Sequence, residues 1–228
     1  MRKYDNATTV ANEGEILASF QYRSLLSYQT YHHIKDIKYG SQNRSTMDFF
    51  PCEHTNKTVI FIHGGYWQWC DKSDFAFIVP YISEKIMQVQ KALDFNAKQN
   101  WKTKEVQLVG HSAGAHLAAV CLNHPLLSEL ALLSGIYDLS PIKETHLNHA
   151  LNLSEEDILK YSPIYQKERT DIPCRILCGD LELSELQWQS QNYFEHRCST
   201  GHELVSFETI SGVNHYSILD HYFKYIFK

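Results

Sequence analysis

The feature that most constrains the fold of this chain is a short turn between an apolar run and a helix-forming run. The turn reads Gly110-His111-Ser112-Ala113-Gly114, with β-like residues at 106–109 before it and good helix formers at 115–122 after it. A G-x-S-x-G sequence in this position is typical of a nucleophile elbow, where a serine sits on a sharp turn and the glycines avoid clashes that a Cβ would cause. The alternative is a plain glycine-rich turn between strand and helix.

Short β-like runs alternate with helix-like segments along the rest of the chain. The expected strands are 46–50, 58–62, 105–109, 130–133, 175–178 and 204–210. The expected helices are 86–98, 115–122, 184–196 and 216–227, with capping boxes at Ser184-x-x-Gln187 and Ser154-x-x-Asp157. This alternation predicts an α/β fold, a mostly parallel, doubly wound sheet with helices on both faces.

Length, composition and charge restrict the other properties of the chain. With 228 residues, 43% of them hydrophobic, we expect one domain over residues 1–228, with 1–30 as an N-terminal extension packed on or near it. The net charge of −5 argues against a nucleic-acid partner. We find neither a secretory signal nor an apolar run long enough to span a membrane, and the six scattered cysteines suggest reduced thiols, so we expect a cytoplasmic protein.

A second glycine-rich loop provides the groups that a serine nucleophile needs. His63-Gly64-Gly65-Tyr66-Trp67 follows directly on the expected strand 58–62. Acyl transfer requires donors for the developing oxyanion, and the carboxyl ends of parallel strands meet at one edge of a sheet. We therefore expect the backbone N–H groups of Gly64, Gly65 and Ala113 to face one point and form an oxyanion hole. The alternative is a tight turn with a buried histidine.

The base and the acid are expected on later loops, since this architecture places serine, acid and histidine in that order along the chain. His215 stands between the strand 204–210 and the last helix, whereas His202 precedes that strand and His221 lies within the helix. The loop after the strand 175–178 offers Asp180 and Glu182. Glu182 is favoured because it reaches past the first turn of the loop, and Asp180 stays the alternative acid, because it could equally cap the following helix.

Several motifs together resemble the kynurenine formamidase (arylformamidase) family of α/β-hydrolases. They are His63-Gly64-Gly65-Tyr66-Trp67-Gln68, Asp71-Lys72-Ser73-Asp74-Phe75, Gly110-His111-Ser112-Ala113-Gly114, Ser134-Gly135-Ile136-Tyr137-Asp138-Leu139 and Leu151-Asn152-Leu153-Ser154. The similarity runs from about Tyr39 to the C-terminus. One departure is Ser184-Glu185-Leu186, where the family often has Pro-Glu-Phe.

The resemblance implies an α/β-hydrolase that cleaves N-formyl aryl amides, typically N-formylkynurenine to kynurenine and formate. It implies Ser112 as nucleophile, His215 as base and Glu182 as acid. The residues by themselves support only acyl transfer to Ser112 and then to water, with no metal and no organic cofactor. Cys174 and Cys178, for example, lack the second Cys/His pair that a zinc site needs.

Aromatic residues near these loops suit an aryl substrate, and two other functions remain open. Tyr66, Trp67 and Tyr137 are expected to bind the substrate, with Trp69 as a weaker candidate, and core packing is their alternative role. A small-molecule carboxylesterase with the same triad is the first alternative function, because fold and triad do not fix the acyl group. A weakly active or non-catalytic homologue, with a homodimer as one possible assembly, is the second.

One strand of the family pattern is expected to be absent between residues 85 and 86. Residues 75–85 lead straight into the expected helix 86–98, and the run 77–82 carries Pro80 in its middle, which makes it a poor central strand. The absent strand would lie between the strands 46–50 and 58–62. We therefore expect either an inward shift of the N-terminal strands by about 4.8 Å or an unpaired edge. The catalytic loops lie on the other side of the sheet and are expected to be complete. The unpaired edge is expected to lower the stability of the protein or promote its association, and to weaken its activity.

Overall fold

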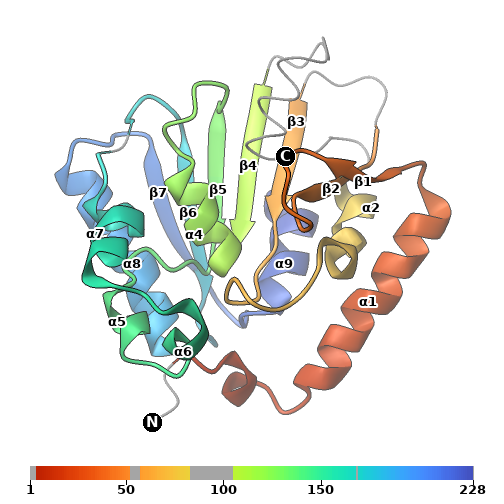
Figure 1. Ribbon diagram of the computed structural model, residues 1–228, viewed down its shortest axis with the longest axis horizontal. Helices are drawn as coiled ribbons and strands as arrows, with labels where there is room; N and C mark the ends of the chain where they lie inside the picture. The colour runs from red at the N-terminus through yellow and green to blue at the C-terminus, as the bar shows by residue number, and fades with distance from the viewer. Residues whose placement is uncertain (1–3, 52–56, 83–104, 168, 228) are drawn as a thin grey trace.

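The centre of the molecule is a five-stranded parallel sheet in the order β3-β4-β5-β6-β7 (Figure 1). The computed structural model describes residues 4–51, 57–82, 105–167 and 169–227. The five strands are β3 (Lys57–Ile62), β4 (Glu105–His111), β5 (Glu129–Leu133), β6 (Cys174–Gly179) and β7 (Val205–Ile210). Each matches an expected strand to within two residues, so the predicted doubly wound α/β architecture is confirmed.

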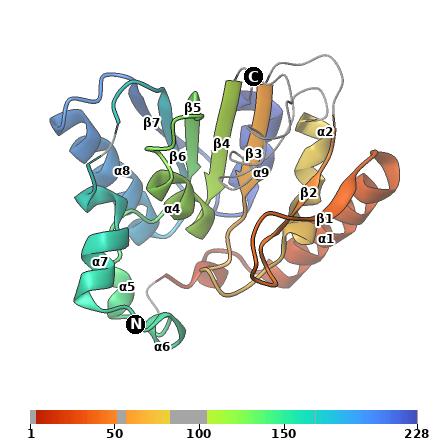
Figure 2. The ribbon, with the colours of Figure 1, turned by 45° about the horizontal axis from the view of Figure 1, so that its top comes forward.

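Side chains alternate between the two faces of the sheet, and helices cover both (Figure 2). Val59 and Val109 belong to one hydrophobic cluster, whereas their neighbours Ile60 and Leu108 belong to a second cluster on the opposite face. The elements that cover the first face are α1 (Glu13–Thr30), η2 (Lys72–Ile78), α2 (Val79–Ile82), α9 (Ser217–His221) and the π-helical turn η4 (Tyr222–Ile226). The second face is covered by α4 (Ala113–Val120) and α8 (Ser184–Ser199). The C-terminal segment thus packs on the sheet as predicted.

The N-terminal part contains a short helical turn, a long helix and a hairpin. η1 (Asn6–Thr9) precedes α1, and β1 (Ile34–Lys38) pairs antiparallel with β2 (Thr46–Phe49) in a separate two-stranded sheet. β2 confirms the expected strand 46–50, while β1 and α1 were not predicted. β1 reads Ile-Lys-Asp-Ile-Lys and is largely exposed, so it lacks the apolar alternation that identifies a strand.

The position expected for the absent strand, between residues 85 and 86, and the expected helix 86–98 lie outside the described residues. Within the described part of the chain, β3 is the last strand of the main sheet and β2 is not hydrogen-bonded to it. The inward shift of the N-terminal strands is therefore wrong, because it would have paired β2 with β3. A cavity of about 560 Å³ lies between these strands, lined by Met47 and Phe50 on one side and by Phe61 on the other.

A series of short helices connects β5 to β6 below the carboxyl edge of the sheet (Figure 1). They are α5 (Ser140–Lys143), α6 (Asn148–Leu151), α7 (Glu155–Tyr161) and η3 (Pro163–Tyr165). The predicted capping box of Ser154 and Asp157 is confirmed at the start of α7. No helix in the described ranges is long and apolar enough to span a bilayer.

The capping box predicted at the start of α8 is wrong. Leu183 is the N-cap residue of this helix, and the hydroxyl of Ser184 bonds to Glu185 instead. The side-chain amide of Gln187 donates to the carbonyl oxygens of Asp180 and Glu182. Gln187 therefore satisfies the backbone of the preceding loop, which is the loop that carries the expected acid.

Candidate active site

Ser112 lies on a strained turn between the last residue of β4 and the first residue of α4. Its backbone has φ 57° and ψ −122°, a conformation that residues other than glycine rarely adopt. A Cβ on Gly110 would lie 2.3 Å from the carbonyl oxygen of Gly114, and a Cβ on Gly114 would lie 2.0 Å from that of Ile62. Both glycines are thus required by contacts with backbone, which confirms the strand-turn-helix geometry predicted for this motif.

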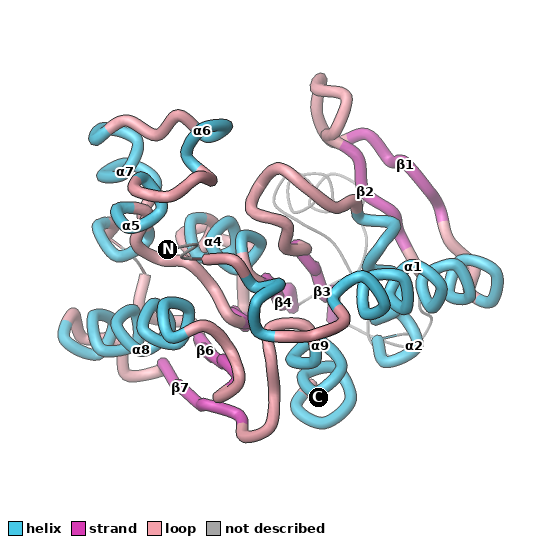
Figure 3. The backbone as a smooth tube through the Cα atoms, turned by 90° about the horizontal axis from the view of Figure 1, so that it is seen from below, coloured by secondary structure: helices cyan, strands magenta, loops and turns pink. Residues whose placement is uncertain are grey.

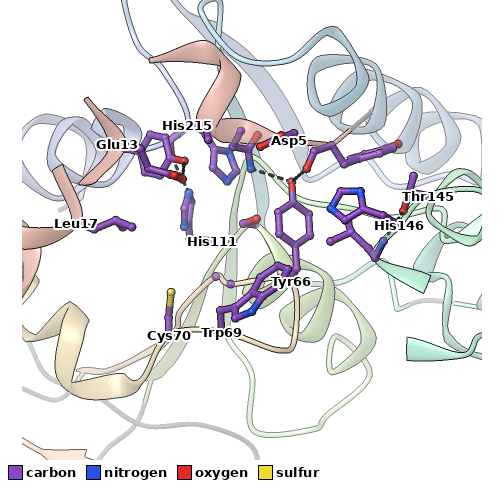
Figure 4. Close-up of a pocket in the computed structure, with 18 of the residues that line it drawn as sticks. Asp5, Glu13, Leu17, Tyr66, Trp69, Cys70, His111, Thr145, His146 and His215 are labelled. Carbon is purple, nitrogen blue, oxygen red and sulfur yellow. Dashed lines mark hydrogen bonds between the residues drawn. The ribbon is translucent and has the colours of Figure 1, made fainter. Parts of the chain in front are cut away.

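Ser112 lines a cavity of about 850 Å³ at the carboxyl edge of the sheet. Figure 4 shows this cavity, with His111 and His215 among the labelled residues of its wall. The backbone N–H of Ser112 donates to the carbonyl oxygen of Leu133 at 2.8 Å, which fixes the turn against β5. His215, Gly64 and Gly65 line the same cavity. The structure therefore brings the expected nucleophile, base and oxyanion loop to one cavity.

Glu182 holds the imidazole of His215 through a buried hydrogen bond. The distance from His215 Nδ1 to Glu182 Oε2 is 2.8 Å, and both residues are more than nine-tenths buried. The other carboxylate oxygen, Oε1, accepts from the hydroxyl of Ser134 at 2.6 Å and from the N–H of Gly179 at 2.7 Å. A carboxylate on Nδ1 favours the tautomer with the proton there, which leaves Nε2 free to accept a proton.

Asp180 has a different place in the same loop. It is exposed, and its carboxylate accepts from the hydroxyl of Ser211 at 2.9 Å and from the N–H of Gly212 at 2.7 Å. These bonds brace the turn that leads from β7 to His215. The structure thus brings Glu182, rather than Asp180, to the imidazole.

His111, the first variable residue of the G-x-S-x-G motif, forms a hydrogen bond with the backbone of His215. Its Nε2 lies 2.8 Å from the carbonyl oxygen of His215, and the two rings are 4.7 Å apart between centroids. Burial, and then the proximity of His215, hold the pKa of His111 well below its ordinary value, so the ring is neutral and Nε2 donates. The sequence offered no signal for this role, because the motif leaves the position unspecified.

The loop that contains Gly64 and Gly65, which is the expected oxyanion loop, packs directly against Ser112, the expected nucleophile. A Cβ on Gly64 would lie 3.0 Å from Cβ of Ser112, and Gly65 has φ 110°. In the described part of the chain, no backbone carbonyl accepts from the N–H of Gly64 or Gly65. Ala113 is the first residue of α4, where backbone N–H groups have no intrahelical acceptor. The donors needed for an oxyanion are therefore available near Ser112.

Two of the predicted substrate-binding aromatics do not line the cavity. Trp67 donates from Nε1 to Nδ1 of His116 at 3.2 Å, and Tyr137 is fully buried and stacks on Tyr193 at 4.2 Å between centroids. Core packing, the alternative role, therefore describes both, because helices α4 and α8 offer each ring a partner. Tyr66 and Trp69 do line the cavity.

Much of the cavity wall comes from residues that the sequence gave no reason to select. Tyr4, Asp5, Asn6 and Glu13 line it from the N-terminal side. On another side lie Glu144, Thr145, His146 and Leu147 from the segment around α5 and α6. None of these follows a strand of the sheet, which is the position that identified the other site residues. Among the described residues, no group of three or more His, Cys, Asp or Glu side chains is placed to hold a metal ion.

Known proteins that resemble this chain in sequence include kynurenine formamidases. No protein-family model matches the chain. A kynurenine formamidase of Danio rerio is 29% identical, covering 82% of this chain and 76% of that protein. One of Drosophila melanogaster is 26% identical over the same shares.

Solved structures with a similar fold include a protein described as a thioesterase and several esterases. A proposed thioesterase from Silicibacter has a TM-score of 0.84 at 20% identity, covering 95% of this chain and 92% of that one. Esterase B of Lactobacillus rhamnosis has a TM-score of 0.69 at 15% identity, with coverages of 93% and 90%. The chain therefore has the α/β-hydrolase fold and is similar in sequence to kynurenine formamidases.

Proposed function

We propose that this protein is a serine hydrolase that cleaves N-formyl aryl amides, with N-formylkynurenine as the main substrate. Ser112 is the nucleophile, His215 the base and Glu182 the acid. The observation that carries the proposal is the buried bond of 2.8 Å between Glu182 and His215 beside a cavity that Ser112 lines. The similarity to kynurenine formamidases supports the choice of the formyl amide.

The proposed reaction has two halves, each with balanced proton transfer. Nε2 of His215 takes the proton of the Ser112 hydroxyl while its oxygen attacks the formyl carbon, and the N–H groups of Gly64, Gly65 and Ala113 stabilise the oxyanion. The C–N bond then breaks, and His215 returns the proton to the departing aryl amine. In the second half His215 takes a proton from a water molecule, whose oxygen attacks the formyl-serine. The ester C–O bond then breaks, His215 returns the proton to the oxygen of Ser112, and the formic acid released ionises to formate in water.

The negative charge of the cavity wall favours binding of the ammonium group of an amino-acid substrate over its carboxylate. Its described lining contains the carboxyl groups of Asp5, Glu13 and Glu144 and no lysine or arginine. Such a wall attracts an ammonium group and repels a carboxylate. We therefore propose that the amine of the substrate faces this wall while its ring lies against Tyr66 and Trp69.

A carboxylesterase is the second candidate function. The structures with the same fold include esterases, and the proposed triad does not distinguish a formamide from a short ester. Comparing kcat/KM on N-formylkynurenine with that on a short aryl ester separates the two functions. A higher kcat/KM on the ester would favour the carboxylesterase.

Substitution of the proposed triad tests both candidates at once. We expect Ser112→Ala and His215→Ala each to lower kcat by several orders of magnitude, since either change leaves only the oxyanion donors. A fluorophosphonate probe is expected to label the wild-type protein and not Ser112→Ala. Ser199→Ala, at an exposed serine at the end of α8, is the matched control. Retention of more than about a tenth of kcat in both triad variants would exclude the assignment.

A further inference from the structure

The N-terminal segment crosses the carboxyl edge of the sheet and reaches the oxyanion loop (Figures 1 and 3). The hydroxyl of Tyr66, the residue after Gly65, donates to the carbonyl oxygen of Tyr4 at 2.6 Å. The same hydroxyl accepts from the side-chain amide of Asn6 at 2.9 Å. Figure 4 shows these bonds at the wall of the cavity. The Tyr66 hydroxyl is thus occupied both as a donor and as an acceptor by N-terminal residues.

The N-terminal segment is itself anchored in the core. Tyr4 is 1% exposed, and its hydroxyl accepts from the side-chain amide of Gln189 at 3.0 Å. The carbonyl oxygen of that amide accepts from the backbone N–H groups of Tyr137 and Asp138, both at 2.9 Å. Tyr4 therefore connects the oxyanion loop to α8 and to the segment after β5. Asn6, which is 6% exposed, is buried beside it.

The backbone of the oxyanion loop is strained, so contacts with other parts of the molecule must hold it in place. Gly65, Tyr66 and Trp67 all have positive φ values, of 110°, 48° and 60°. For the two residues with side chains, this conformation is unfavourable and persists only where the surroundings hold it. Trp67 is held by its bond to His116, and Tyr66 by its bonds to the N-terminal segment.

Loss of the hydrogen bonds of Tyr66 would shift the backbone N–H groups of Gly64 and Gly65, which precede Tyr66 in the chain. The N–H of Gly65 belongs to the residue before Tyr66, and Gly64 packs on the side chain of Ser112. Burial raises the pKa of Tyr66, so its hydroxyl keeps its proton and stays a donor over the pH range of ordinary assays.

We propose that Tyr66 is a positioning residue, whose hydroxyl, held by Tyr4 and Asn6, fixes the Gly64 and Gly65 N–H groups as oxyanion donors. The N-terminal segment is then part of the active site, although it contributes no reacting group. This inference rests on the proposed function, because it requires that an oxyanion forms at Ser112. It gives Tyr66 a role in the transition state, separate from contact between its ring and the substrate.

The test is Tyr66→Phe, which removes the hydroxyl and keeps the ring. We measure kcat, KM and the affinities for two ligands. The first ligand is an aryl trifluoromethyl ketone, whose adduct with serine carries an oxyanion. The second is the product kynurenine, which carries no oxyanion. We expect kcat to fall about tenfold or more with KM changed less than about threefold. The ketone affinity should fall by the same factor as kcat/KM, while kynurenine binds as before.

Two further variants complete the experiment. Asn6→Ala removes one of the two bonds and should produce a smaller loss of the same kind. Tyr28→Phe is the matched control, because it removes a tyrosine hydroxyl that donates to Asp48 away from the cavity of Ser112. This control is expected to lower the melting temperature without changing kcat or the ketone affinity.

Three results would overturn the inference. The first is a Tyr66→Phe protein that keeps kcat and ketone affinity within about twofold of wild type. The second is an equal loss of affinity for the ketone and for kynurenine, which would show that Tyr66 acts in ground-state binding. If Tyr66→Phe does not fold, the same two affinities are measured in Asn6→Ala. The third overturning result is an Asn6→Ala protein whose affinity for the ketone equals that of the wild type. Wild-type turnover, and its loss in Ser112→Ala, tests the proposed function separately.

Discussion

The two carboxylates on the loop after β6 contact different groups, and this difference yields a prediction at the scale of single residues. Glu182 binds the ring of His215, while Asp180 binds the turn at Ser211 and Gly212. We expect Glu182→Gln to lower kcat by about 10²–10⁴-fold, because an amide can favour the wrong imidazole tautomer and carries no charge to stabilise the imidazolium. Steady-state kinetics on an aryl formamide measures the loss.

Asp180→Asn is the matched variant for this prediction. It should lower kcat less than about threefold and reduce the melting temperature slightly, because the amide keeps one acceptor for the turn. A larger loss of kcat in Asp180→Asn than in Glu182→Gln would transfer the role of acid to Asp180.

Residues that follow a strand could be found from the sequence, and residues that act through distant contacts could not. Ser112, Glu182 and His215 all stand just beyond expected strands, where parallel sheets place their functional groups. Ser134 also follows a strand, but its bond to Glu182 joins residues 48 positions apart. The bond of Tyr4 to Tyr66 spans 62 positions, and no local pattern in the sequence encodes it.

At the scale of elements, the contact between β3 and the start of α4 depends on the absence of a side chain at Gly114. We expect Gly114→Ala to lower the free energy of unfolding by at least about 2 kcal/mol, because its Cβ would meet the backbone of Ile62 and His63 within 2.5 Å. Gly14→Ala is the control, since nothing lies within 4 Å of its Cβ position. It should leave stability unchanged or raise it by up to about 1 kcal/mol. Urea denaturation of both variants measures the difference, and equal stabilities would contradict this packing.

Periodicity was a good guide to the elements of the main sheet and a poor one to the rest. The strands β3 to β6 are mostly buried, largely apolar runs, so their composition identifies them. β7 is more exposed and begins with alternating apolar and polar residues, which is the other pattern typical of a strand. α1 was missed because its apolar face is narrow: Phe20 is buried, while Tyr22, Leu25 and Leu26 are all more than 40% exposed. Its place is set by contacts with η2 and by the ion pair of Arg23 with Asp220, which are tertiary.

At the scale of the whole molecule, a buried neutral histidine makes stability depend on pH. His116 accepts from Trp67 and donates to the carbonyl oxygen of Tyr161, and burial lowers its pKa from 6.5 to about 4. Because the unfolded chain takes up this proton more readily, the stabilisation is complete above about pH 6.5 and is lost as the pH falls toward 4. The expected contribution is about 3 kcal/mol, and the lowered pKa of His111 acts in the same direction.

His116→Gln tests this dependence, because glutamine can accept and donate in the same place but does not titrate. Thermal unfolding between pH 7 and pH 4.5 should show a smaller fall in melting temperature for this variant than for wild type. His149→Gln, at an exposed position in α6, should follow the wild-type curve. Identical pH dependence in all three proteins would contradict the assignment to His116.

The backbone strain around the cavity also has an evolutionary consequence. Tyr66, Cys70 and Ser112 all line the cavity with positive φ, and Ser112 is the most buried of the three. At such a position glycine relieves about 1–2 kcal/mol, so the chain would be more stable without its serine. The proposed role of Ser112 as nucleophile gives a reason why the chain keeps serine where glycine would be more stable. In a lineage that no longer needed this role, we expect Ser112→Gly to be tolerated, leaving an intact fold, a higher melting temperature and no hydroxyl at position 112.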